Sequence, residues 1–274
     1  MKNILLPTDF SNNAWTAALY AFQLFKQEAC TFYFLHSTML KASTGTSFSS
    51  KLSRVMTENA QEDLTELKLK AEAENANPKH SFEIILCTYD LQDAIESVCN
   101  RQNVDMVVMG TKGITGALDI VFGTNTIDTI KNLKSCPLLA IPDDFEYEVP
   151  TQIAFPTGFI RTYGKTLEPL IALANLHGAH IHVVHINTED ELSEDQQHNL
   201  AQLKIALEHH PHTLHWLPDY DKKERGITEF IKASETNILA MINYKQTFIE
   251  ILLNEPVIKK IGAQLKIPFM VIPG

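Results

Sequence analysis

Short apolar runs alternate with segments of helical character along the first half of the chain. Five runs have the length of strands: residues 3–7, 31–36, 82–86, 104–109 and 138–141. Four segments between them are expected to form helices: residues 13–28, 51–75, 91–100 and 124–134. This alternation predicts right-handed crossovers and a parallel sheet. We therefore expect a doubly wound α/β domain, with any ligand outside the carboxyl ends of its strands.

The second half of the chain repeats landmarks of the first. Residues 153–159 (IAFPTGF) correspond to residues 4–10 (ILLPTDF), and an apolar residue followed by histidine comes later at the same spacing in both halves. Residues 267–273 correspond in the same way to residues 136–142. The sequence therefore predicts an internal duplication whose copies have diverged. We expect one domain at 1–142, an acidic linker flanked by prolines at 143–150, and a second domain at 151–274.

The richest chemical signal of the first half lies after the strand at 104–109. Gly110 ends this strand, Gly113 follows in the loop, and Gly123 with Thr124 opens the helix at 124–134. A strand, a glycine-bearing loop and a helix N-terminus form an arrangement that holds a phosphate, because free amides and the helix dipole face the anion. The spacing is neither that of the P-loop nor GxGxxG. The alternative is that these glycines only shape the connection.

The pattern Gly-x2-Gly-x9-Gly-Thr resembles the nucleotide motif of the universal stress protein family. The resemblance implies a tandem member with two Rossmann-like α/β domains, each a five-stranded mainly parallel sheet flanked by helices. It implies ATP, ADP or AMP as ligand, with or without magnesium. It also implies that Asp9, Ser37 and Met109 line the adenine and ribose side, although the family often has an aliphatic residue where this sequence has Ser37. The remaining site residues are neighbours of these positions: Pro7, Thr8 and Asn125.

Asp9 also has a simpler interpretation. It lies between an apolar strand and a predicted helix that Ser11 or Asn12 can cap. An aspartate there can act as a turn residue without any ligand. Both roles remain open from the sequence.

The second half lacks the features that would hold a phosphate. Gly158 stands where the first half has Asp9, and no glycine occurs between Gly226 and Gly262. Residues 254–256 (NEP) take the place of 123–125 and put Glu255 where a phosphate would lie. We therefore expect one nucleotide per chain, bound in the first half. The resemblance implies that the second half is a partner domain: residues 138–141 and 269–272 would meet in an intrachain pseudo-dimer, with a further homodimer left open.

Composition narrows the range of partners and compartments. The net charge of −10 argues against binding nucleic acid or an anionic membrane. No apolar run reaches the length of a membrane span, and the N-terminus lacks the features of a signal peptide. The four cysteines show no metal-ligand spacing, which favours a reducing, cytoplasmic location. His180 and His182 share a strand face and can begin a zinc site, but no third ligand occurs at a regular spacing, so dispersed surface histidines are the better interpretation.

Three functions remain open. The first is a nucleotide-binding regulatory or stress protein, and the second is a slow ATPase or nucleotidyl- or phosphoryl-transfer enzyme that uses the same site. The third is a structural pair of domains without a ligand. The sequence supplies no evident base or nucleophile at the glycine loop, and only Asp9 and Asp119 are candidate metal carboxylates. We therefore expect binding with little or no turnover, and we assign no catalytic and no metal-ligand residue.

Overall fold

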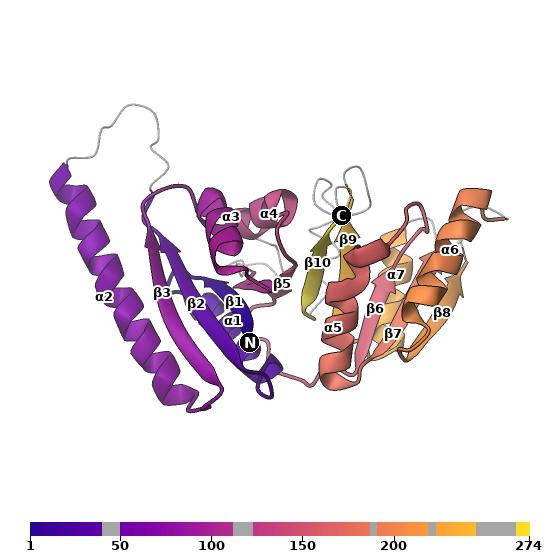
Figure 1. The fold of residues 1–274 in the computed structure, drawn as a ribbon, viewed down its shortest axis with the longest axis horizontal. Helices are drawn as coiled ribbons and strands as arrows, with labels where there is room; N and C mark the ends of the chain where they lie inside the picture. The colour runs from indigo at the N-terminus through magenta and orange to yellow at the C-terminus, as the bar shows by residue number, and fades with distance from the viewer. Residues whose placement is uncertain (40–49, 112–122, 187–190, 219–222, 245–266) are drawn as a thin grey trace. The chain divides into compact units, whose positions relative to one another are not determined.

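The chain folds into two compact units. The computed structural model describes residues 1–39, 50–111, 123–186, 191–218, 223–244 and 267–274 (Figure 1). Unit 1 comprises residues 1–111 and 123–144, and the remaining described residues, from 145 onward, belong to unit 2. None of the helices in the described ranges has both the length and the apolar composition needed to cross a bilayer.

Unit 1 alternates strands and helices throughout. Its elements are β1 (Lys2–Pro7), α1 (Asn12–Leu24), β2 (Cys30–Ser37), α2 (Ser50–Glu74), β3 (His80–Cys87), α3 (Leu91–Gln102), β4 (Met106–Gly110), α4 (Thr124–Asn132) and β5 (Leu138–Ile141). The strands are all parallel and lie in the order β3-β2-β1-β4-β5. This arrangement confirms the doubly wound α/β fold that the alternating pattern predicts.

Helices cover both faces of this sheet. Right-handed crossovers place α1 and α2 on one face and α3 and α4 on the other. On the first face, α1 packs against β1 and β4, and α2 lies along β2 and β3 (Figure 1). An aromatic cluster fills the space beneath α1: the Phe22 ring lies 4.9 Å from that of Phe32 and 5.2 Å from that of Phe82, between centroids. Burial of these rings secures α1 to the sheet.

Unit 2 has the same strand order as unit 1. Its elements are β6 (Gln152–Pro156), the 3₁₀ helix η1 (Gly164–Leu167), α5 (Glu168–His177), β7 (His180–Ile186), α6 (Glu194–Leu207), β8 (His212–Leu217), α7 (Lys223–Ala233), β9 (Ile238–Asn243) and β10 (Phe269–Pro273). The strands are parallel in the order β10-β9-β6-β7-β8. Each unit is therefore a five-stranded parallel sheet with helices, as expected.

Several element ends differ from the sequence prediction by a few residues, and the local reason is clear for two of them. The strand expected from Val104 begins at Met106, because Asn103 ends α3 in the left-handed conformation (φ 47°) and the Val104 amide still donates to the Cys99 carbonyl. Helix α1 ends at Leu24 rather than near Glu28. After it the chain makes tight turns, in which the Glu28 amide donates to the Phe25 carbonyl at 2.9 Å.

All four cysteines lie in unit 1, and all are free and buried. Burial raises the pKa of the Cys30 thiol to about 12. Cys136 donates to Cys99, with the two sulfurs 3.6 Å apart. This contact and burial both raise the pKa of Cys136. Cys30 and Cys136 are therefore protonated components of the core rather than nucleophiles.

Candidate functional site at the carboxyl edge of unit 1

The predicted binding residues of unit 1 leave the same edge of its sheet. Strand β1 pairs with β2 up to Pro7 and Leu35, and on its other side it pairs with β4. Because all three strands are parallel, the residues that follow Pro7, those around Ser37 and those around Gly110 come together at this edge. The Thr126 hydroxyl donates to the Gly110 carbonyl at 3.1 Å and so fixes the start of α4 there. Gly113 lies outside the described residues.

The turn after β1 is a network of short-range hydrogen bonds. The Thr8 amide donates to the Leu35 carbonyl at 2.8 Å, and Phe10 adopts a positive φ of 62° with its amide donating to the Thr8 hydroxyl. The Ser11 amide donates to Oδ1 of Asp9 at 3.1 Å. Asp9 is thus a turn residue, as its simpler interpretation has it. Its side chain is nevertheless exposed, so the turn leaves the carboxylate accessible to a ligand.

Helix α1 begins at this turn and passes very close to β4. Its N-cap is Ser11, whose hydroxyl accepts from the Ala14 amide at 3.2 Å. A Cβ atom added at Gly110 would lie 2.0 Å from Oδ1 of Asn13 and 2.6 Å from its backbone oxygen. Gly110 therefore permits the first turn of α1 to lie against the end of β4. The side-chain Nδ2 of Asn13 donates to Oδ1 of Asp143 at 3.0 Å.

The N-terminus of α4 is suited to hold an anion. Its N-cap is Gly123, at φ −62° and ψ 157°, and no side chain caps the helix. Thr124 and Asn125 are exposed, so the first turn of α4 is open to a ligand. The first amides of a helix have no intrahelical acceptor and lie at the positive end of the helix dipole. A phosphate placed here would be bound by main-chain N–H groups and needs no cationic side chain.

The start of α3 holds the site together, which the sequence did not indicate. Gln92, in the first turn of α3, donates to the Asn125 carbonyl at 3.3 Å and accepts from the Thr129 hydroxyl at 3.0 Å. The Ser37 hydroxyl donates to the Tyr89 carbonyl at 2.5 Å. Segment 89–92 thus connects the end of β2 with the beginning of α4. The only sequence signal for it is Asp90, which caps α3 by accepting from the Gln92 amide.

Met109 and Thr111 lie deeper at this edge. Met109 is buried, with 6% of its surface exposed, so within the described residues its side chain belongs to the core beside the site. Thr111, which follows Gly110, is also buried, and its hydroxyl has no hydrogen-bond partner among the described residues. A buried hydroxyl without a partner is unfavourable, and it lies directly before the segment that contains Gly113.

The corresponding edge of unit 2 has the same turn after its first strand. The Thr157 amide donates to the Val184 carbonyl at 2.9 Å, and Phe159 has a positive φ of 55°. The Thr157 hydroxyl is paired with the hydroxyl of Tyr163, which is buried. Residues 254–256, expected to replace the phosphate-binding helix start, lie outside the described residues.

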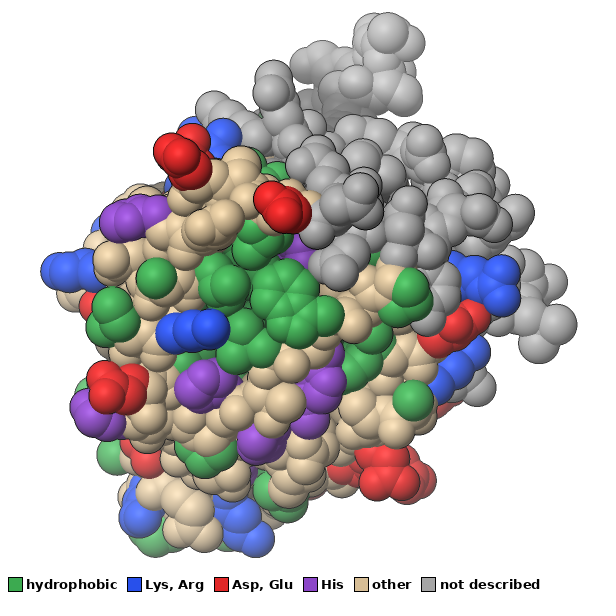
Figure 2. Space-filling view, turned by 90° about the vertical axis from the view of Figure 1, so that its right-hand side faces the viewer, with side chains coloured by type: hydrophobic (Ala, Val, Ile, Leu, Met, Phe, Trp, Pro, Cys, Tyr) green, Lys and Arg blue, Asp and Glu red, His purple; other side chains and the backbone are tan. Residues whose placement is uncertain are grey.

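The histidines of unit 2 form hydrogen bonds with one another and with neutral groups. Nδ1 of His182 lies 2.9 Å from Nε2 of His215, and Nε2 of His182 lies 2.7 Å from Oε1 of Gln152. His180 contacts the Thr213 hydroxyl. Figure 2 shows histidine and hydrophobic side chains beside one another on the face that includes β8. In the described part of the chain, no three potential ligands are arranged to hold a metal ion.

Comparisons with known proteins agree with this architecture. The sequence profile of the universal stress protein family matches residues 1–142. No curated protein matches the chain. Among solved structures, the chain is similar to a universal stress protein from Archaeoglobus fulgidus DSM 4304, with a TM-score of 0.73 and 17% identity over 98% of this chain and 95% of that one. It is also similar to a functionally unknown protein from Pseudomonas aeruginosa PAO1, with a TM-score of 0.60 and 12% identity over 100% of this chain and 92% of that one. At these identities, the likeness shows the fold of both units.

Proposed function

The chain belongs to the universal stress protein family, and from that premise we propose that it binds one adenine nucleotide in unit 1 and acts as a regulatory protein of the stress response. The phosphates are assigned to Gly110, Gly113, Gly123 and Thr124. The nucleoside is assigned to Asp9, Ser37 and Met109, next to Pro7 and Thr8, with Asn125 at the start of α4. Bound ATP, ADP or AMP would then set the conformation or the partner choice of the protein.

One observation carries this proposal: the uncapped N-terminus of α4 is fixed beside the end of β4. Gly123 supplies no capping side chain, and Thr126 bonds the Gly110 carbonyl. A helix start of this kind attracts an anion by its dipole and its free amides. Two glycines of the family motif lie at these positions: Gly110 ends β4, and Gly123 is the N-cap of α4. The exposed Asp9 carboxylate lies at the same edge, where a ribose hydroxyl can donate to it.

The proposal assigns binding rather than turnover to the site. Phosphoryl transfer needs a positioned attacking group and usually a metal ion. Magnesium that arrives with the nucleotide would be held mainly by phosphate oxygens and water, with Asp9 as the candidate carboxylate. Any ATP hydrolysis should therefore be far slower than the ~1–10³ s⁻¹ of ordinary enzymes.

We also propose that unit 2 is a partner domain within the same chain. In its own unit, β5 is the last strand of the sheet order, and so is β10. Such edge strands need a partner or a cover. Pairing of residues 138–141 with 269–272 would make each chain its own pseudo-dimer, with domains at 1–142 and 151–274 joined by the linker 143–150. A further homodimer is compatible with this arrangement.

Substitution of Gly123 tests the nucleotide proposal. Gly123→Glu should abolish ATP binding in isothermal titration calorimetry, because the carboxylate places a like charge at the phosphate. The backbone torsions of Gly123 are ones that any residue adopts, so the variant should fold normally. Gln61→Glu is the matched control: it adds the same charge to unit 1 at an exposed position of α2 and should bind like the parent. Gly123→Ala separates bulk from charge.

Parent-like ATP binding by Gly123→Glu would refute the assignment of the phosphates to α4. Mass spectrometry of the nucleotide that co-purifies with the folded parent would identify which of ATP, ADP and AMP is the ligand.

A further inference from the structure

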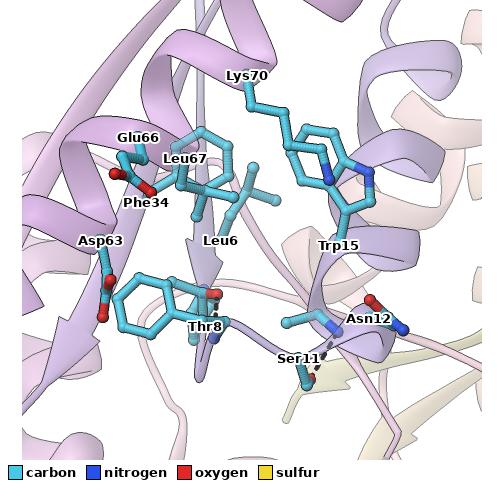
Figure 3. Close-up of a pocket in the computed structure, with 13 residues that line it drawn as sticks. Leu6, Thr8, Ser11, Asn12, Trp15, Phe34, Asp63, Glu66, Leu67 and Lys70 are labelled. Carbon is cyan, nitrogen blue, oxygen red and sulfur yellow. Dashed lines mark hydrogen bonds between the residues drawn. The ribbon is translucent and has the colours of Figure 1, made fainter.

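A cavity of about 430 Å³ lies between α1 and α2 of unit 1 (Figure 3). This volume is within the range of small-molecule sites. Its walls come from both helices, and its floor from β1 and β2. It shares Pro7 and Thr8 with the proposed nucleotide site, but neither Gly110 nor the start of α4 lines it. Helix α4 covers the opposite face of the sheet, so this cavity is a separate place in unit 1.

The interior of the cavity is apolar and aromatic. Leu6 and Phe34 form the floor and are almost completely buried, and Leu67 of α2 lies above them (Figure 3). Trp15 of α1 forms one wall. Its ring meets that of Phe22 edge-on at 6.2 Å between centroids, a contact that orients the indole. A ligand with an apolar body could therefore be desolvated here.

The face of Trp15 already serves as a cation-binding surface. Nζ of Lys70 lies 4.0 Å from the centroid of the indole ring. An ammonium group at this distance is attracted by the negative face of the ring. Lys70 is on the exposed side of α2, and its flexible side chain can move aside for another cation.

The opposite wall carries two carboxylates without partners. Asp63 and Glu66 are exposed and lie one turn apart on α2, and Figure 3 shows them across the cavity from Trp15. Neither forms a hydrogen bond or an ion pair with any described residue. Some other charges of this helix are paired, as in Arg54 with Glu58 and Lys68 with Glu72. With Lys70 included, the lining carries one net negative charge.

The same lining disfavours an anion. The N-terminus of α1 enters the cavity, but the Ser11 hydroxyl accepts from the Ala14 amide and Asp9 accepts from the Ser11 amide. These contacts already occupy two of the N–H groups that a phosphate would use. The two carboxylates would also repel it.

We propose that this cavity binds a small organic cation, an amine or guanidinium group on an apolar body. The apolar body would lie on Leu6, Phe34 and Leu67, and the charge would lie between the two carboxylates and the indole of Trp15. This site differs from the proposed nucleotide site, since apart from the shared lining residues Pro7 and Thr8 it uses other side chains, and it takes the opposite charge.

Three ligands of similar shape test the proposal: 2-phenylethylamine, 2-phenylethanol and 3-phenylpropionate, which are cationic, neutral and anionic at pH 7. The chain has two tryptophans, so a Trp216→Phe background leaves Trp15 as the fluorescent reporter. The amine should change its fluorescence saturably and bind roughly tenfold more tightly than the other two, the combined effect of cation–π and carboxylate attraction. Equal affinity for the three ligands, or no saturation with the amine at millimolar concentration, would overturn the proposal.

Charge variants locate the site. Asp63→Asn with Glu66→Gln should weaken amine binding roughly tenfold and leave binding of the alcohol unchanged. Glu62→Gln with Glu74→Gln is the matched control, because it makes the same charge change on exposed positions of α2 outside the cavity. If both double variants lost the same amine affinity, the attraction would come from the overall negative charge of the protein, and the proposed site would be refuted. Gly123→Glu should bind the amine like the parent, which separates this outcome from that of the nucleotide proposal.

Discussion

Residues 8–11 of unit 1 and 157–160 of unit 2 follow equivalent strands and begin with the same turn. Phe10 and Phe159 both have a positive φ, and each packs on a histidine with ring centroids 4.6 Å apart. That histidine contacts the carbonyl of Thr8 in unit 1, at 2.8 Å, and of Thr157 in unit 2, at 2.9 Å. The turn is therefore a structural element of the fold, and its presence alone does not indicate a ligand.

The helix after the turn is where the units diverge. Ser11 caps α1, whereas the corresponding residue of unit 2 is Ile160, 69% exposed, which has no capping oxygen. In unit 2 the helical segment begins only at Gly164, with η1 before α5. The fourth strands differ as well: the position of Gly110, paired with Ile141, is taken by Ile242, paired with Ile272. In unit 1, the close approach of α1 to β4 thus goes together with the Ser11 cap and with Gly110. At the corresponding positions unit 2 has Ile160 and Ile242.

The largest effect is expected from Gly110→Ala. Its Cβ would overlap Asn13, including the backbone oxygen, so α1 or β4 must move. Overpacking of this kind costs about 1–3 kcal/mol, and we expect nucleotide binding to fall with it. Gly158→Ala is the control, because its Cβ would meet only the Ile160 side chain at 3.3 Å. Urea denaturation with ATP calorimetry measures both. If Gly110→Ala and Gly158→Ala had the same free energy of unfolding, the close packing of α1 at Gly110 would not be a real difference between the two units.

A smaller effect is expected from Ser11→Ala, which removes the cap of α1. Loss of a serine N-cap costs about 0.5–2 kcal/mol. The matched change in unit 2, Ile160→Ala, should alter stability by less than about 0.5 kcal/mol, because an exposed side chain with no capping role is removed. Thermal denaturation of both variants makes the comparison. A parent-like melting temperature for Ser11→Ala would show that the cap does not support α1.

The smallest effect concerns pH and is confined to unit 2, because His182 is partly exposed and solvent screens its interactions. Burial, together with His180 and His215, lowers the pKa of His182 from 6.5 to about 4. His182 therefore binds a proton near pH 6.5 in the unfolded chain but only near pH 4 in the folded chain. The free energy of unfolding should thus fall as the pH drops from about 6.5 to about 4. His182→Asn should flatten that part of the urea-midpoint profile between pH 7 and 4. His198→Asn, an exposed control, should not. Identical profiles for His182→Asn and the parent would contradict the assignment.

The sequence predicted the fold well because the pattern itself encodes it. Apolar runs such as 138–141 became strands at their predicted positions, and Ser11 capped α1. The sequence showed that unit 2 lacks a glycine in this region, but the packing role of Gly110 against α1 was not predicted, because it depends on how closely a helix approaches a strand. The role of Gln92 was also missed, since its partners lie more than thirty residues away in the chain. Gly113 and the helix start at 254–256 remain predictions.

The cavity between α1 and α2 illustrates the same limit. The charged sequence of α2 is typical of a helix with a solvated face, and from Arg54 onward most of its side chains are exposed or partly exposed. It does not reveal that Asp63 and Glu66 face an aromatic wall on another helix. Such a pairing arises only from the crossover geometry that sets α1 beside α2.

The distribution of two residue types makes the units separately observable. The four buried thiols all belong to unit 1, so a thiol-reactive dye can reach them only when that unit opens. The two tryptophans are divided, with Trp15 in unit 1 and Trp216 in unit 2. The rate of thiol labelling therefore measures how fast unit 1 opens. The fluorescence of single-tryptophan variants reports the unfolding of unit 1 through Trp15 and of unit 2 through Trp216. The chain carries its own reporters of whether its two halves unfold together.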